Sequence, residues 1–133
     1  MTPKKVLIAE DDEDDQTLFY YYLQNRKDIV LLPMTENGVE LIEALTRITN
    51  TDDLPDLIIL DQNMPKKNGL QTLQFLKSRS TYKKIPVMVC STYLDQSLIN
   101  SCTTCGASAV ITKPVTQEGY NDMINTFLGA IGS

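Results

Sequence analysis

Five short apolar runs alternate with longer amphipathic stretches along this chain of 133 residues. The runs cover residues 4–9, 29–34, 57–60, 87–90 and 109–111. The third and fourth runs are almost continuously apolar, which is typical of strands covered on both faces of a sheet. Asp56 and Pro86 precede them, and both residue types often stand where a new element begins. The pattern predicts five strands, of which the central ones are fully buried.

The stretches between the runs carry apolar residues at helical spacing. They cover residues 14–25, 38–48, 69–76, 94–102 and 120–128. This (βα)5 alternation predicts an α/β fold, a doubly wound five-stranded parallel sheet with helices on both faces and right-handed crossovers. We expect one domain over residues 1–133, with no output domain. Sheets of this kind bind ligands at the carboxyl ends of their strands.

The charge and composition exclude several classes of protein. The net charge of −5 argues against a nucleic-acid surface, which needs clustered Lys and Arg. No stretch resembles a signal peptide or reaches the ~18 apolar residues that a membrane span needs, so we expect a soluble, cytoplasmic protein. The chain has no histidine, which excludes histidine bases, Ser–His pairs and phosphohistidine donors. If a phosphoryl group is transferred here, this chain can be an acceptor but not a histidine donor.

The cysteines raise the question of redox or zinc chemistry. Cys102 and Cys105 form a C-x-x-C motif, but they fall late in a helical pattern, where this spacing places two small apolar groups on one helix face. We interpret them as packing residues. Zinc is disfavoured because Cys90 is the only other cysteine and there is no histidine.

Polar residues follow four of the apolar runs. Six acids, residues 10–15, come directly after the first run, and Asp61 follows the third. Ser91 and Thr92 follow the fourth, and Lys113 comes shortly after the fifth. These are the positions at which a parallel sheet of this type places its ligands.

Three of the acids favour a cation. If the first and third strands are neighbours, the carboxylates of Glu10, Asp11 and Asp61 lie within roughly 5 Å of each other. Each like-charged pair then costs about 3 kcal/mol at an effective dielectric of ~20. Raised pKa values or a bound cation would offset this, and Mg²⁺ suits carboxylates together with phosphate oxygens. With Lys113 and the Ser91 hydroxyl, the set contains the groups needed to form an aspartyl phosphate.

Simpler interpretations exist for several of these residues. Residues 12–15 are well explained as a helix cap and as partners of the helix macrodipole. Taken singly, Lys113 is an ordinary solvated lysine and Ser91 an ordinary hydroxyl at a strand end. Asp61, which closes a fully apolar run, is harder to explain in this way.

Four stretches carry a resemblance to a known family. They are residues 6–12, residues 56–65 with Asn68-Gly69, residues 85–91 and residues 106–114. Together they resemble the receiver domain of two-component response regulators, in its stand-alone, chemotaxis-type form. The resemblance spans essentially the whole chain and implies a flavodoxin-like sheet with strand order 2-1-3-4-5.

The resemblance implies a phosphoacceptor and a metal site. Asp61 matches the phosphoacceptor, and Glu10 and Asp11 match the acidic pair. The cofactor implied is Mg²⁺, which Asp61 and Asp11 would bind directly and Glu10 would bind through water. The backbone carbonyl of Asn63 would be a further ligand.

The resemblance also implies a switch beside the acceptor. Ser91 matches the switch hydroxyl, Thr92 a small residue whose backbone faces the phosphoryl group, and Lys113 the pocket lysine. The bond between Lys113 and Pro114 would be cis. Many receivers carry a rotating Tyr or Phe where this chain has Val110, so the usual aromatic relay is absent here.

Two sets of residues are candidates for partner contacts. The resemblance implies a state-dependent surface on the fourth helix, fifth strand and fifth helix. Its candidate residues are Tyr93, Leu94, Val110 and Tyr120. On the first helix, Leu18, Tyr22 and Leu23 point inward, so Tyr20 and Tyr21 are predicted to be exposed and available for docking of a phosphodonor.

The function implied is a phosphorylation-dependent signalling switch rather than an enzyme that turns over other molecules. Its partners would be a histidine kinase or phosphotransfer protein and a downstream protein, with no nucleic acid or membrane. One alternative is a binding module that signals without phosphate. A less favoured one is a haloacid dehalogenase-type phosphohydrolase, which carries an Asp at the position of Asn63.

Overall fold

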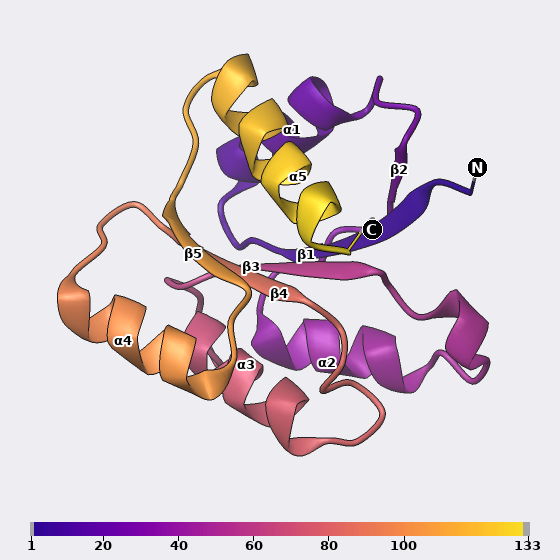
Figure 1. The fold of residues 1–133 in the computed structure, drawn as a ribbon, viewed down its shortest axis with the longest axis vertical. Coiled ribbons are helices and arrows are strands. Elements are labelled where there is room, and N and C mark those ends of the chain that lie inside the picture. Colours follow the sequence, from indigo (N-terminus) through magenta and orange to yellow (C-terminus); the bar gives the residue numbers. More distant parts are fainter. Residues whose placement is uncertain (1, 132–133) are drawn as a thin grey trace.

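A computed structural model describes residues 2–131 and contains one parallel sheet (Figure 1). Its strands are β1 (Lys4–Ala9), β2 (Ile29–Leu31), β3 (Leu57–Asp61), β4 (Val87–Ser91) and β5 (Ala109–Thr112). Their order across the sheet is β2-β1-β3-β4-β5. The predicted (βα)5 fold and its strand order are confirmed.

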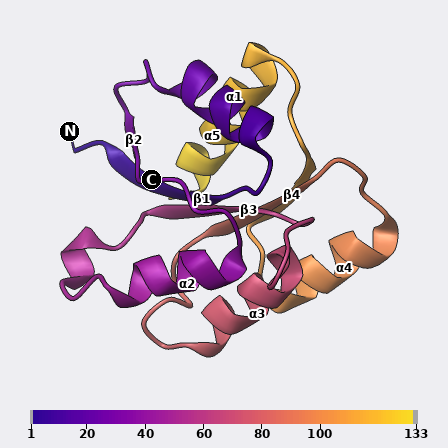
Figure 2. The ribbon, with the colours of Figure 1, turned by 180° about the vertical axis from the view of Figure 1, so that it is seen from behind.

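The helices lie in two layers, one on each face of the sheet. They are α1 (Glu13–Leu23), α2 (Gly38–Thr46), α3 (Gly69–Ser78), α4 (Gln96–Cys105) and α5 (Gln117–Ile131). Helices α1 and α5 cover one face, and α2, α3 and α4 cover the other (Figures 1 and 2). A short 3₁₀ helix, Thr51–Asp53, lies between α2 and β3 and was not predicted.

Alternating residues of the buried strands belong to two different hydrophobic clusters, one on each face of the sheet. In β1, Val6 and Ile8 pack under α1 and α5, whereas Leu7 and Ala9 pack under α2, α3 and α4. All five residues of β3 are buried, as are all five of β4. Both strands are therefore covered on each face, which explains why their runs lack polar alternation.

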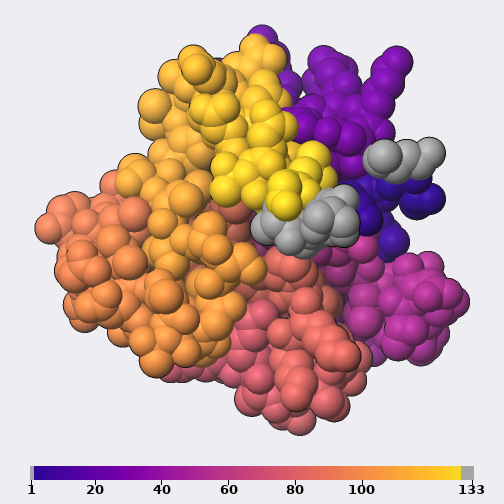
Figure 3. All heavy atoms as spheres, viewed as in Figure 1, coloured from indigo at the N-terminus to yellow at the C-terminus, as the bar shows by residue number. Residues whose placement is uncertain are grey.

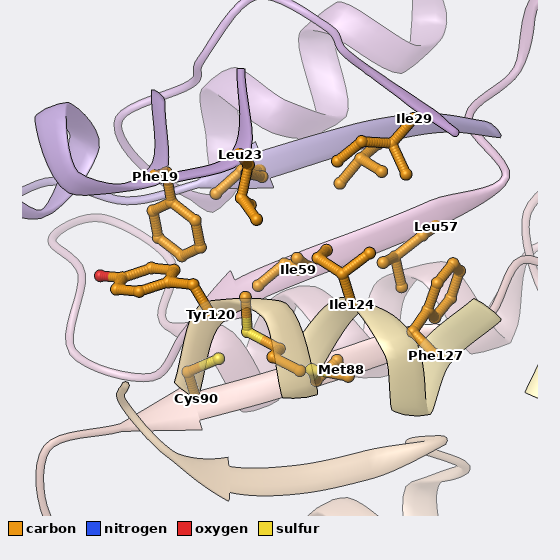
Figure 4. Packing of buried hydrophobic residues seen from close by; sticks show 13 residues of the cluster. Phe19, Leu23, Ile29, Leu57, Ile59, Met88, Cys90, Tyr120, Ile124 and Phe127 are labelled. Carbon is orange, nitrogen blue, oxygen red and sulfur yellow. The ribbon is translucent and has the colours of Figure 1, made fainter. Parts of the chain in front are cut away.

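The cluster under α1 and α5 contains an aromatic group (Figure 4). The rings of Phe19 and Tyr120 meet edge to face, with centroids 5.2 Å apart. Tyr22 lies 5.1 Å from Tyr120 on the same measure. Tyr120 is completely buried, so its predicted place on a partner-facing surface is wrong. Its ring joins α5 to α1 instead.

The second strand is shorter than the sequence predicted. We expected residues 29–34, but β2 ends at Leu31. Pro33 has no amide hydrogen and therefore cannot donate to the ladder, which restricts it to edges and strand ends. The chain returns to the sheet at Thr35, which forms an isolated bridge with Ala9.

Two predictions on exposure and cysteine packing are confirmed. Tyr20 is 39% exposed and Tyr21 is 65% exposed on the outer side of α1. Cys102 is buried and Cys105 is half-buried, and both are free thiols at the end of α4. Between residues 2 and 131, no helix is both long and apolar enough to cross a membrane.

Candidate functional site

The register of the sheet brings four strand ends together. Ala9 pairs with Leu60, so the residues that follow them, Glu10 and Asp61, lie at the same edge. Ser91 pairs with Thr112, and the amide of the following residue, Lys113, donates to the Ser91 carbonyl at 2.8 Å. The polar residues at four strand ends thus belong to one edge of the sheet.

Three carboxylates converge at this edge. Ligand oxygens of Glu10, Asp11 and Asp61 all lie within 4.8 Å of one another. Glu10 is completely buried and Asp61 is 4% exposed, whereas Asp11 faces solvent. The predicted acidic cluster is therefore present, with two members inside the protein and one at its mouth.

The local sequence explains how α1 begins beside this cluster. The Asp12 side chain caps α1 by accepting a hydrogen bond from the Asp15 amide at 3.0 Å. The Asp12 amide in turn donates to Glu10 Oε2 at 3.2 Å. The turn after β1 is consequently fixed at both sides, and it holds Glu10 in the pocket.

A single ammonium group lies among the acids. Lys113 Nζ is 2.9 Å from Glu10 Oε1, 3.4 Å from Asp61 Oδ2 and 2.8 Å from Asp15 Oδ2. The Lys113 side chain is only 10% exposed. A buried charge of this kind needs paired partners, and the three acids provide them.

Burial and charge shift the pKa values of this group. Burial raises the pKa of Glu10 above its ordinary value, although Lys113 opposes the rise. Burial also raises the pKa of Asp61, against the lowering effects of Glu10 and Lys113. For Lys113, burial favours the neutral form, but hydrogen bonds and charges from Asp15, Glu10 and Asp61 raise its pKa overall. Lys113 thus opposes the effect of burial on both buried carboxyl groups without cancelling it.

The donor set suits a divalent cation. Asp61 Oδ1 is buried and has no hydrogen-bond partner within the described residues. An acceptor left without a partner inside a protein is costly unless a cation or donor satisfies it. Carboxylates at the mouth and in the interior of the pocket are the oxygen ligands that hard cations prefer. The residues therefore fit a divalent metal.

The Ser91 hydroxyl, which was predicted to act as a switch, makes its hydrogen bonds within the turn after β4. The Ser91 hydroxyl donates to the Tyr93 carbonyl at 2.8 Å and accepts from the Tyr93 amide at 3.3 Å. Thr92 is exposed in the bend after β4, and Asn63 is exposed in the loop after β3. Ser91 would have to break its local hydrogen bonds before its hydroxyl could reach a group on Asp61.

Two expectations about the fifth strand can be compared with the structure. The bond between Lys113 and Pro114 is trans, so the predicted cis bond is wrong. The trans form is favoured by about 0.5–1 kcal/mol, and Lys113 reaches the acids with it in place. Val110 is half-buried and packs on the cluster under α2, α3 and α4. It stands at the position where the resemblance implies a rotating Tyr or Phe, which this chain lacks.

Asp15 is a member of the site that the sequence interpretation missed. It had been assigned to helix capping with its neighbours, yet it makes the shortest contact to Lys113. No local spacing identified it, because Asp11 precedes the Asp12 cap and only Asp15 lies in the first turn of α1. Within a run of six acids, Asp15 does not differ from its neighbours.

Comparison with known proteins gives a consistent result. A family model for the response regulator receiver domain matches residues 6–125. Chemotaxis protein CheY1 of Helicobacter pylori is 30% identical over 94 residues, covering 71% of this chain and 73% of that protein.

Solved structures give the same result at the level of the fold. The phosphorylated cyanobacterial phytochrome response regulator RcpA superposes with a TM-score of 0.80 and 28% identity, covering 96% of this chain and 92% of that chain. The Mn²⁺-bound form of response regulator Rcp1 superposes with a TM-score of 0.78 and 26% identity, covering 95% of this chain and 92% of that chain.

Proposed function

The chain belongs to the response regulator receiver domain family, and from this premise we propose that it is a signalling switch set by phosphorylation of Asp61. The observation that carries the proposal is the convergence of one lysine and three carboxylates at the end of β3. Asp61 ends β3, is 4% exposed, and its Oδ1 has no hydrogen-bond partner within the described residues. This oxygen is the proposed nucleophile.

The proposed chemistry is a single phosphoryl transfer. An Asp61 carboxylate oxygen forms a bond to phosphorus while the bond between phosphorus and the donor's leaving atom breaks. With a phosphohistidine donor, the imidazole nitrogen leaves with the electron pair of that bond. Because the acceptor is already a carboxylate, no proton has to be removed from it, which agrees with the absence of a histidine base.

We propose Mg²⁺ as the cofactor, held by Asp11, Asp61, the Asn63 carbonyl and, through water, Glu10. Bound there, Mg²⁺ would neutralise charge on the phosphoryl oxygens. Lys113 supplies a second positive charge, which can hydrogen-bond a phosphoryl oxygen. The Mn²⁺-bound form of Rcp1, a structural relative, supports a divalent metal in this fold.

Phosphorylation would act on the rest of the molecule through Ser91. The new group adds about −1.5 to −2 charges and three acceptor oxygens. We propose that Ser91 turns from the Tyr93 carbonyl toward a phosphoryl oxygen, while Thr92 offers its backbone amide. Tyr93 is 75% exposed and loses a hydrogen bond in this step, so the loop that leads from β4 into α4 is the segment whose state changes.

The partners that fit this chemistry are a histidine kinase or phosphotransfer protein and a downstream protein. Tyr21, exposed on α1, is a candidate contact for the phosphodonor. For the downstream protein, we propose the surface of α4, β5 and α5, seen in orange to yellow in Figure 3. Tyr93 and Leu94 precede α4 and remain candidates for contacts there.

The two rival functions have less support. A haloacid dehalogenase-type phosphohydrolase needs an acid two residues after the nucleophile, and Asn63 cannot serve as one. A binding module without phosphorylation would have no use for buried carboxylates, whose burial is costly. Val110, which cannot act as a rotating aromatic, is the one residue that favours this second alternative.

The test is phosphorylation of the purified chain by acetyl phosphate with Mg²⁺. We expect intact-mass spectrometry to detect one added phosphoryl group on the parent and none on Asp61→Asn, while Asp14→Asn serves as a charge-matched control. Omitting Mg²⁺ should abolish the addition. An unmodified parent, or equal modification of Asp61→Asn, would contradict the proposal. Turnover of unrelated phosphoesters would favour the phosphohydrolase.

A further inference from the structure

The contact between Asp15 and Lys113 has no role in the transfer step described above. Lys113 Nζ lies 2.8 Å from Asp15 Oδ2, and this is the shortest of its three contacts with acids. The contact with Asp61 is the longest, at 3.4 Å. Asp15 is on α1, whereas Asp61 ends β3, so the ammonium is held toward the helix and away from the phosphoacceptor.

The hydrogen-bonding capacity of a lysine makes this position consequential. An ammonium has three N–H donors and no acceptor, and here three carboxylates surround it. Once Asp61 is phosphorylated, its carboxylate charge is carried by the phosphoryl oxygens, and one of these takes over the contact with Lys113. Because the present contact with Asp61 is the longest, at 3.4 Å, the ammonium must move toward β3 to donate to that oxygen, and this lengthens its contact with Glu10 or with Asp15.

Burial indicates which of these two contacts lengthens. The side chain of Glu10 is 1% exposed, so its release from the ammonium would leave a buried acid without its partner. The Asp15 side chain is 24% exposed and lies in the first turn of α1. Water and the helix N-terminus can stabilise its charge after release.

We infer that Asp15 is a positioning residue that retains Lys113 on the α1 side of the pocket and thereby restrains phosphorylation of Asp61. The inference rests on the proposed function. It adds a competition: each phosphoryl group that arrives must take the ammonium from the Asp15 carboxylate. Removing the charge of Asp15 should make that exchange easier.

The experiment compares initial rates of phosphorylation by acetyl phosphate with Mg²⁺ in four proteins. These are the parent, Asp15→Asn, Asp15→Glu and Asp14→Asn. We expect Asp15→Asn to be phosphorylated about five-fold faster, the factor that matches a partly exposed ion pair. We expect Asp15→Glu to return close to the parent rate, because it restores a carboxylate near Lys113. A merely structural lesion would lower the rate instead.

The Asp14→Asn variant separates this mechanism from general charge repulsion. Asp14 is exposed in the same turn, and no ion pair within the described residues involves it. A rate increase in Asp14→Asn equal to that in Asp15→Asn would overturn the inference, since repulsion of the anionic donor would then explain both. An unchanged or lower rate in Asp15→Asn would also overturn it.

Unfolding of the unphosphorylated protein supplies a second measurement. Urea titrations of Asp15→Asn, Lys113→Met and the double variant form a double-mutant cycle. We expect the effect of Asp15→Asn to disappear once Lys113 is gone, and additive effects would overturn the ion pair itself. Suppose that none of the proteins is phosphorylated, although the cycle shows that Asp15 and Lys113 are coupled. The proposed function then fails, and the inference that Asp15 restrains phosphorylation fails with it. If the parent is phosphorylated and Asp15→Asn is not faster, only the inference fails.

Discussion

Replacing Lys113 by Met should destabilise the metal-free protein by about 3 kcal/mol. The substitution keeps most of the aliphatic stem and removes the ammonium that lies 2.9 Å from Glu10 and 3.4 Å from Asp61. At an effective dielectric of ~20, each of these buried pairs is worth roughly 5 kcal/mol before desolvation is subtracted. Desolvation of the ions offsets several kcal/mol of this gain.

Protonation of Glu10 limits the loss. Burial raises the pKa of Glu10 to about 8, so this carboxyl group binds a proton near neutral pH and relieves part of the lost pairing. Asp61, whose side chain is 4% exposed, loses the same partner. The loss should therefore lie at the lower end of the ~3–5 kcal/mol typical of a broken buried pair.

The assay is urea unfolding with a chelator present and, separately, with Mg²⁺. For a slope of about 2 kcal/mol per M urea, a 3 kcal/mol loss lowers the midpoint by roughly 1.5 M. Mg²⁺ should narrow the difference between variant and parent, because a second cation can then compensate the acids. Lys27→Met is the control: Lys27 is exposed, and its removal should change stability by less than about 0.5 kcal/mol.

Two outcomes would refute this reasoning. A loss below about 1 kcal/mol without metal would mean that the ammonium does not compensate the buried acids. A loss of the expected size that Mg²⁺ leaves unchanged would mean that metal and lysine do not share the same carboxylates. In either case the electrostatic description of the pocket would be wrong.

Three further predictions concern the fold around the site. Gly38→Ala should lower the free energy of unfolding in urea by about 2 kcal/mol, because the added Cβ would collide with a threonine hydroxyl of α3. Gly129→Ala is the control: its Cβ would enter open space, and the change should be neutral or stabilising. Cys90 should resist alkylation in the native protein, since burial raises the pKa of its thiol to about 12, and mass mapping should find half-buried Cys105 modified first. Tyr120→Phe should leave the melting temperature unchanged or raise it, because the Tyr120 hydroxyl is buried and has no hydrogen-bond partner within the described residues. A decrease of more than about 1 kcal/mol in the free energy of unfolding would mean that the hydroxyl has a partner.

The fold could be predicted because its signals are local. Continuous apolar runs mark strands covered on both faces, and β3 and β4 match their predicted runs to within one residue. The end of β2 was missed, because the apolar pattern continues through Pro33 and hides the loss of an amide donor. Patterns of hydrophobicity predict burial better than they predict where backbone pairing stops.

Those residues of the candidate site that stand directly at the end of a strand could be predicted from the sequence. Glu10 and Asp61 are adjacent because parallel strands end at one edge. Asp15 and Tyr120 depend instead on how α1 and α5 pack over that edge, which no local pattern records. The two predictions failed in the same direction: Asp15 was assigned to helix capping and lies in the pocket, and Tyr120 was assigned to a partner-facing surface and lies in the core.

The outer strands of the sheet have a consequence for the behaviour of the protein at high concentration. β2 contains three residues and β5 contains four, so each edge offers few unpaired backbone groups to another chain. Long flat edges recruit neighbouring molecules into extended sheets, and short ones deny them a template. Pro33 therefore has a protective effect: by ending β2 early, it limits uncontrolled self-association of the protein at high concentration.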